Sequence, residues 1–152
     1  MLNRPLSLFL WALKGLRDFK ALDVDDREIV FYSEDNASRV FFEPIIKELL
    51  ETHEKTVCYL TSSPDDPVLT RPTNQIRGFY IGSGLVRTYL SWTLKASILI
   101  MTMPDLETYY FKRSKVMPVH YIYVFHALAS TSMVYRSGAF DHFDALFCVG
   151  PY

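Results

Sequence analysis

His126 is the side chain whose place in the sequence best suits proton-transfer chemistry. It ends the apolar and aromatic run Tyr121-Ile-Tyr-Val-Phe125, and small and hydroxyl residues follow it directly. A buried parallel strand that delivers a polar residue to its carboxyl end has this pattern, and ligands of open α/β sheets bind outside that end. Neutral imidazole accepts a hydroxyl proton near neutral pH. His126 is therefore a candidate general base; a phosphate partner and a hydrogen-bonded core histidine are the alternatives.

Polar residues that suit a phosphate group or a substrate hydroxyl occur in three further places. The loop at 33–39 leads into a predicted helix, whose N-terminus favours an anion; helix capping is the alternative there. The turn at 82–84 either is simply tight or lets the backbone approach a ligand closely. The hydroxyl residues at 130–132 cap a helix or bind phosphate. The candidate binding residues are Glu34, Asn36, Ser38, Arg39, Ser83, Gly84, Ser130, Thr131 and Ser132.

The remaining reactive side chains show no pattern of a metal site or of an activated nucleophile. His120 precedes the run that His126 ends, His142 falls in a turn, and no spacing resembles a zinc set. Cys58 and Cys148, the two cysteines, each fall inside a predicted strand. We therefore expect two buried free thiols in a reducing, cytoplasmic setting, with no metal and no cofactor.

The composition is that of one globular domain. The chain has 152 residues, of which 49% are hydrophobic and 22% charged, enough for a sizeable core. The net charge of -1 and the lack of a basic block give no reason to expect nucleic acid as a partner. No stretch is long and apolar enough for a membrane-spanning helix.

Strand and helix patterns alternate along residues 28–152. Strands are predicted at 28–33, 56–61, 75–81, 97–102, 121–125 and 145–149, helices at 39–52 and 85–94, and short helices or turns at 105–111 and 137–143. Ser38 can cap the first helix, and Pro44 either lies in its kinked first turn or the helix begins near Glu43. The pattern predicts an α/β fold, a Rossmann-like parallel sheet with helices on both faces. Right-handed crossovers then bring the loops after the strands to one rim.

An amphipathic helix is predicted to precede this domain at residues 1–20, with a polar linker at 21–27. The segment 4–20 combines basic residues, Arg4, Lys14, Arg17 and Lys20, with large apolar ones, Leu6, Phe9, Leu10, Trp11, Leu13 and Phe19. The helix either packs on its own domain or on a missing partner domain, or it makes a peripheral contact with a membrane surface.

Two segments resemble one known family. Phe125-His126-Ala127, followed by hydroxyl residues, and Phe143-Asp144-Ala-Leu-Phe-Cys-Val-Gly150 are similar to motifs of the CDP-glycerol glycerophosphotransferases, which are teichoic-acid polymerase-like enzymes with the GT-B fold. The family usually has Gly after the histidine and a Lys soon afterwards. This chain has Ala127 and no later Lys.

The resemblance implies that residues 28–152 are a single GT-B half, the acceptor side of a membrane-associated transferase in cell-wall teichoic acid biosynthesis. His126 would take the proton of a hydroxyl on a polyol- or sugar-phosphate acceptor, and a second domain would bind the nucleotide-activated donor. We expect the chain alone to be inactive. A non-catalytic α/β domain that binds a phosphorylated ligand or a partner protein, and a sugar-nucleotide epimerase-like half, are the alternatives.

Overall fold

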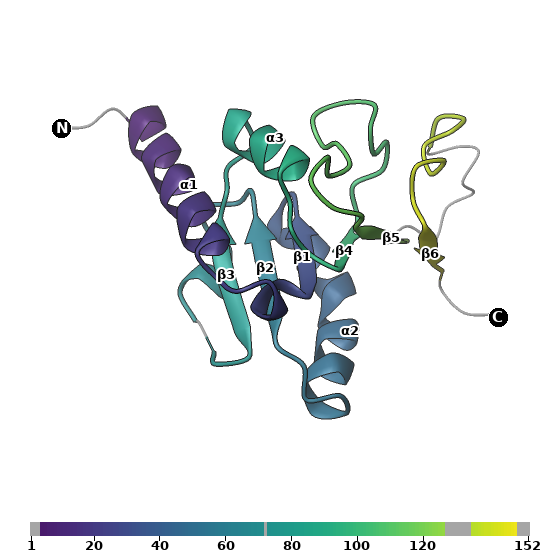
Figure 1. Ribbon diagram of the computed structural model, residues 1–152, viewed down its shortest axis with the longest axis horizontal. Coiled ribbons are helices and arrows are strands. Elements are labelled where there is room, and N and C mark those ends of the chain that lie inside the picture. Colours follow the sequence, from purple (N-terminus) through teal and green to yellow (C-terminus); the bar gives the residue numbers. More distant parts are fainter. Residues whose placement is uncertain (1–3, 72, 127–134, 149–152) are drawn as a thin grey trace.

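The computed structural model shows a six-stranded, entirely parallel sheet with helices on both faces (Figure 1), as the sequence predicts. Residues 4–71, 73–126 and 135–148 are described. The strands are β1 (Ile29–Ser33), β2 (Val57–Thr61), β3 (Ile76–Tyr80), β4 (Ile98–Met101), β5 (His120–Val124) and β6 (Ala145–Phe147), and the helices are α1 (Arg4–Lys20), α2 (Arg39–Glu51) and α3 (Leu85–Trp92). The spatial order is β3-β2-β1-β4-β5-β6, so the direction of winding reverses between β1 and β4.

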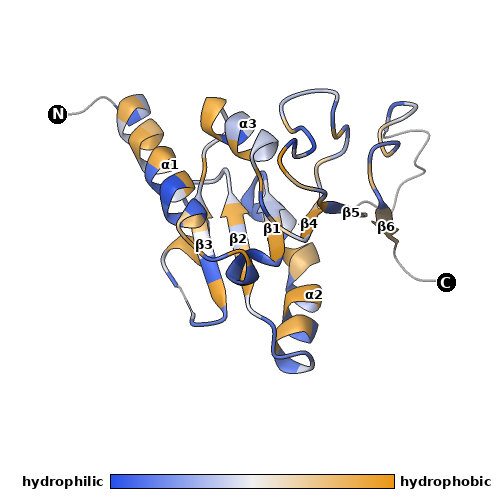
Figure 2. Ribbon diagram, viewed as in Figure 1, coloured by the Kyte–Doolittle hydropathy of each residue, from blue (hydrophilic) through white to orange (hydrophobic). Residues whose placement is uncertain are grey.

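Two apolar cores lie on opposite faces of the sheet. Helices α1 and α3 cover one face and α2 covers the other. Successive residues of β1 therefore point to different cores: Phe31 packs edge-on against Phe42 of α2 at 5.3 Å between ring centroids, and Tyr32 faces the core under α3. All five residues of β1 and of β2 are buried. Figure 2 shows hydrophobic residues in these central strands. Near-continuous apolar runs are what a sheet covered on both faces requires.

Helix α1 packs on its own domain, as the first of the two alternatives for this segment predicts. Ala12, Gly15, Leu16 and Phe19 are buried against β3 and α3. Large apolar side chains outside this buried stripe stay partly exposed, namely Leu6, Phe9, Leu10, Trp11 and Leu13. Of these, Trp11 lies against Tyr80 of β3, at 4.6 Å between ring centres. Among the described helices, none is both long and apolar enough to cross a bilayer.

The segment at 21–27, predicted to be a linker, contains a short 3-10 helix (Asp25–Arg27). Arg27 is buried, with its guanidinium carbon 5.5 Å from the ring centre of Phe19. The segment thus contacts the end of α1.

The prediction that Ser38 caps the first helix is wrong. A 3-10 turn, Asn36–Ser38, precedes α2, so Ser38 already has helical backbone angles. A helix N-cap residue has extended backbone angles. Here that residue is Asp35, and its carboxylate accepts the backbone N–H of Ser38 at 3.1 Å. Helix α2 itself begins at Arg39 and includes Pro44.

Only one of the two cysteines is buried as predicted. Cys58 in β2 is buried, its thiol donates to the carbonyl oxygen of Asp26 at 3.3 Å, and burial raises the pKa of this thiol to about 12. Cys148 is exposed. Strand β6 ends at Phe147 and lies at the edge of the sheet, so Cys148 falls beyond the last paired residue. A position after an edge strand has fewer neighbours to cover it than a position in a central strand.

Candidate functional site

The carboxyl ends of the parallel strands share one edge, and the predicted site residues divide there into separate groups. Glu34, Asn36 and Ser38 lie in the loop after β1, and His126 follows β5. Ser83 and Gly84 lie between β3 and α3. Ser130, Thr131 and Ser132 lie outside the described residues.

The imidazole of His126 is exposed at this edge. It lies 5.6 Å from the ring of Phe41 in α2 and 6.2 Å from the ring of Tyr123 in β5, measured between ring centres. Tyr123 is fully buried among other aromatic rings, those of Phe125, Tyr135, Phe140 and Phe143. The imidazole of His126 therefore lies next to a cluster of aromatic rings and is itself exposed to solvent.

A hydrogen-bond chain assigns the protons of this histidine. Nδ1 of His126 lies 3.4 Å from the hydroxyl oxygen of Tyr123, and that hydroxyl donates to the hydroxyl of Tyr135 at 3.0 Å. The single proton of Tyr123 is thus used, so its oxygen accepts a hydrogen from Nδ1, and the lone pair of the neutral ring lies on Nε2. Burial, followed by the bond to Tyr135, raises the pKa of Tyr123, which keeps this hydroxyl protonated. Nε2 is therefore the basic atom.

The predicted residues of the loop after β1 and of the start of α2 do not form one group. The hydroxyl of Ser38 accepts from Oγ1 of Thr102, just after β4, at 2.9 Å. Asn36 is exposed. Arg39 pairs with Glu43 one helical turn along α2 at 3.3 Å and lines a cavity of about 350 Å³ on the α2 face. The structure therefore joins the ends of β1 and β4, but it shows no contact between Arg39 and His126.

The turn at 82–84 is tight, as one of its two interpretations predicts. Gly82 has a φ of +63°, a conformation that favours glycine. Ser83 and Gly84 line a second cavity, of about 260 Å³, together with apolar residues of α1 and β3. These two residues thus face the amino-terminal helix, and no contact in the described part of the chain links them to His126.

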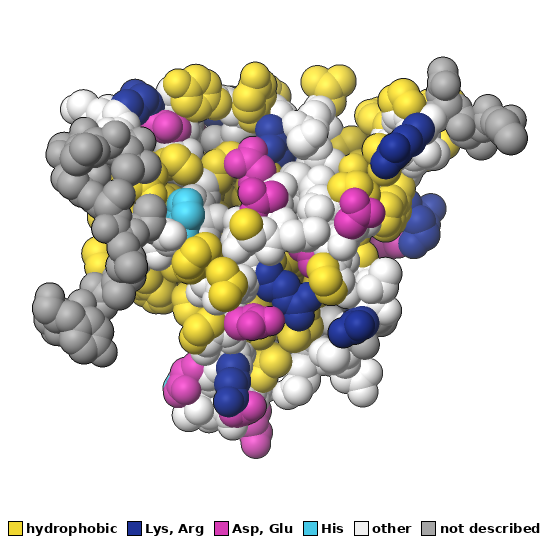
Figure 3. Space-filling model, turned by 180° about the vertical axis from the view of Figure 1, so that it is seen from behind, with side chains coloured by type: hydrophobic (Ala, Val, Ile, Leu, Met, Phe, Trp, Pro, Cys, Tyr) yellow, Lys and Arg dark blue, Asp and Glu magenta, His cyan; other side chains and the backbone are white. Residues whose placement is uncertain are grey.

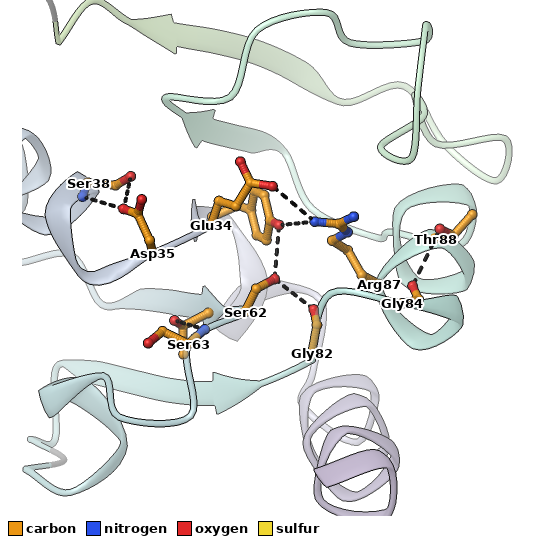
Figure 4. A network of polar contacts seen from close by, with 11 residues as sticks. Glu34, Asp35, Ser38, Ser62, Ser63, Gly82, Gly84, Arg87 and Thr88 are labelled. Carbon is orange, nitrogen blue, oxygen red and sulfur yellow. Dashed lines mark hydrogen bonds and ion pairs between the residues drawn. The ribbon is translucent and has the colours of Figure 1, made fainter. Parts of the chain in front are cut away.

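A buried arginine that sequence reasoning missed lies at the same edge. Arg87 of α3 is 3% exposed, and its Nη1 donates to the hydroxyl of Tyr32 at 3.1 Å and to a carboxylate oxygen of Glu34 at 3.4 Å. Figure 4 shows Glu34 and Arg87 pointing toward one another from the end of β1 and from α3. The hydroxyl of Tyr32 is also 3.0 Å from that of Ser62, which donates to the carbonyl oxygen of Gly82 at 2.6 Å. This group, Tyr32, Glu34, Ser62 and Arg87, is called the Arg87 cluster below.

The helical spacing of the sequence contained a signal for this arginine. Val86, Leu90 and Leu94 form the apolar face of the predicted helix, and the residues buried in α3 are Val86, Arg87, Leu90 and Ser91. Arg87 is next to Val86 and three residues before Leu90, so it lies on that inner face. An arginine at such a position has to find partners inside the protein.

Charges on the surface do not gather by sign on the face seen in Figure 3, where Lys and Arg side chains lie among Asp and Glu. Within residues 4–71, 73–126 and 135–148, no three His, Cys, Asp or Glu side chains are grouped so that they could hold a metal ion. Among the described residues, this edge offers the exposed imidazole of His126 and the buried guanidinium of Arg87, with the carboxylate of Glu34 beside the latter. No protein-family model, no curated protein and no solved structure matches this chain.

Proposed function

We propose that this chain is the acceptor-side domain of a transferase similar to the CDP-glycerol glycerophosphotransferases, which moves a phosphopolyol from a nucleotide donor to a hydroxyl acceptor. The observation that supports the proposal best is the exposed imidazole of His126 at the carboxyl edge, with Nδ1 turned to Tyr123. Ligands of such sheets bind outside this edge, so a bound acceptor presents its hydroxyl to Nε2.

In the proposed reaction, the acceptor oxygen forms a bond to the phosphorus of the phosphopolyol. The bond between that phosphorus and the bridging oxygen of the nucleotide donor breaks, and a nucleoside monophosphate leaves with the electron pair. The hydroxyl proton passes to Nε2 of His126. Proton transfer by a positioned side chain contributes roughly a hundred- to ten-thousand-fold to a rate.

Binding of a polyol phosphate to the chain tests this role of His126. We expect glycerol 3-phosphate to shift the imidazole ¹⁵N resonances of His126, and His126→Ala to weaken its binding about ten-fold, because a hydrogen bond to a polar ligand is lost. Calorimetric titration gives the affinity. Turnover is not the readout, because the proposal assigns the nucleotide donor to another domain.

His120→Ala is the matched control, because His120 is the exposed residue at the opposite end of the same strand, β5. It should leave the affinity for glycerol 3-phosphate unchanged. Equal affinities of the wild-type chain and His126→Ala, with circular dichroism showing both folded, would contradict the proposed role.

Helix α1 suits an enzyme whose acceptor is linked to a membrane. Leu6, Phe9, Leu10 and Leu13 are between 40% and 49% exposed. The last turn of the helix carries Arg17 and Lys20. An exposed apolar side flanked by cations is typical of a helix that lies in the interface of an anionic bilayer. We therefore propose a peripheral membrane contact through residues 4–20.

Vesicle co-sedimentation tests this contact. The chain should bind vesicles that contain phosphatidylglycerol, should bind pure phosphatidylcholine less, and should be released by salt. Leu10→Ser should weaken binding about ten-fold, since one large apolar side chain then no longer enters the bilayer. Val40→Ser on α2, where Val40 is 60% exposed, is the control and should bind as the wild type does. Equal effects of the two substitutions would rule out α1 as the contact.

A further inference from the structure

We propose that Arg87 forms a subsite for a phosphate group of the ligand, and that Glu34 occupies this subsite when the ligand is absent. The ligand class follows from guanidinium chemistry. That the phosphate belongs to the acceptor of a transferase rests on the function proposed above, whereas the anion site itself does not.

Arg87 lies where the winding of the sheet reverses. The chain passes from β1 through β2 to β3 on one side, and from β4 through β5 to β6 on the other. Arg87 contacts Tyr32 and Glu34 at the end of β1, and its guanidinium carbon is 5.4 Å from the ring centre of Tyr110, in the segment after β4. Open α/β sheets bind their ligands at this point of reversal. The position is therefore that of a ligand-binding group.

The guanidinium of Arg87 is buried, but not all of its N–H donors have hydrogen-bond partners among the described residues. Its side chain is 4% exposed, and Nε is buried without a hydrogen-bond partner among the described residues. Its hydrogen bond to Tyr32 and its contact with Glu34 both come from Nη1. A buried cation with an unpaired N–H is costly. The Glu34 carboxylate satisfies only part of the guanidinium, and a ligand oxyanion that takes its place would offset more of this cost.

The carboxylate of Glu34 is held loosely enough to be replaced. Its side chain is 54% exposed, and one contact of 3.4 Å joins it to Arg87. The pair between Arg113 and Asp144 is different: Nη2 of Arg113 contacts both carboxylate oxygens, at 3.0 and 3.3 Å, and Asp144 also accepts the N–H of Tyr121 at 2.8 Å. Asp144 is thus fixed from two sides. Glu34 can turn into solvent and leave its place to a phosphate.

The rest of the cluster orients the arginine. Nη1 of Arg87 donates to Tyr32, and Ser62 donates to the carbonyl oxygen of Gly82. The contact of 3.0 Å between Tyr32 and Ser62 must then use the proton of Tyr32. The hydroxyl protons of Tyr32 and Ser62 are therefore both engaged within the protein, and the guanidinium supplies the donors for the ligand. One guanidinium group can donate two parallel hydrogen bonds to two oxygens of the same phosphate.

Binding of inorganic phosphate to three variants tests the subsite. Glu34→Gln should tighten phosphate binding roughly three- to five-fold, because a competing and repelling carboxylate at a half-exposed position is removed. Arg87→Lys should weaken it about ten-fold, since a lysine cannot make the paired contacts. Phosphate should also shift the Nε–H resonance of Arg87 in a ¹⁵N correlation spectrum of the wild-type chain.

Glu43→Gln is the matched control, because it frees Arg39, the arginine that the sequence suggested for phosphate, from its own carboxylate partner. We expect Glu43→Gln to leave the phosphate affinity unchanged. Tighter binding by Glu43→Gln, with Glu34→Gln unchanged, would overturn the proposal in favour of Arg39. The Glu34→Gln result decides the matter even where Arg87→Lys fails to fold.

The proposed function can fail separately from this subsite. Phosphate binding that depends on Glu34 and Arg87 supports the subsite whether or not His126 responds. A ligand that binds at Arg87 without any shift of the His126 resonances would contradict the role of the histidine and leave the anion site in place.

Discussion

Gly15→Leu should lower the unfolding free energy by about 3 kcal/mol, because the new side chain would overlap a neighbouring strand. A Cβ atom at Gly15 would lie 2.0 Å from the carbonyl oxygen of Tyr80 and 3.0 Å from its carbonyl carbon. These are backbone atoms at the end of β3, so they cannot move aside as a side chain does. A glycine inside a helix ordinarily destabilises it by about 1 kcal/mol relative to alanine. Here the close approach of α1 to the sheet reverses the sign.

Thermal unfolding followed by circular dichroism checks this prediction. The expected fall in melting temperature is about 6–12 °C for a domain of this size. Ser7→Leu, on an exposed position of the same helix, is the control and should change stability by no more than about 0.5 kcal/mol. Similar melting temperatures for Gly15→Leu and Ser7→Leu would mean that α1 does not pack on β3 as described.

Replacing Tyr123 should separate the packing of the aromatic cluster from the orientation of His126. Tyr123→Ala removes a fully buried ring and should cost about 3–5 kcal/mol of stability. Tyr123→Phe keeps the ring and loses the hydroxyl between His126 and Tyr135, so the cost should fall to about 1 kcal/mol. Urea unfolding curves of the two variants measure this difference.

The protonation of the imidazole gives a second, independent readout. In the wild type we expect the ¹⁵N signal of an N–H at Nδ1 of His126 and that of a bare nitrogen at Nε2. Tyr123→Phe should give a mixture of the two tautomers. Tyr135→Phe removes the acceptor of the Tyr123 proton, so Tyr123 can donate to Nδ1 and the hydrogen of the ring should move to Nε2.

Tyr109→Phe serves as the control, because Tyr109 is 59% exposed and makes no contact with His126 among the described residues. It should leave the tautomer unchanged. If Tyr123→Phe and Tyr135→Phe also leave the imidazole ¹⁵N signals unchanged, the hydrogen-bond chain does not orient the histidine.

Most of the fold was predictable from local patterns. The apolar runs at 28–33 and 56–61 became β1 and β2 with one residue trimmed from the amino end of each, because central strands are buried on both faces and show it in every residue. The predictions failed at ends and edges. Ser38 lost its capping role to Asp35 because a local 3-10 turn precedes α2. Cys148 is exposed because β6 lies at the edge of the sheet, which is a tertiary outcome.

The candidate site also contains one residue that the sequence predicted and one that it did not. His126 was predictable because it follows the last apolar residue of a strand, and the place of a strand end is visible in the sequence. Arg87 was missed because its partners, Glu34 and Tyr32, are 53 and 55 residues away. No local pattern indicates that α3 will lie beside the end of β1.

By itself, the sequence determined the alternation of strands and helices, the burial of the strands, and which polar residues follow them, since all three depend on periodicities of two and 3.6 residues within short segments. Only the tertiary structure decided which of those polar residues meet. The strand order brings β1 between β2 and β4, and this order places a buried guanidinium, a tyrosine hydroxyl and a carboxylate within hydrogen-bonding distance. These contacts are a few ångströms long but join residues 53 and 55 positions apart in the sequence, so they exist only once the sheet has formed.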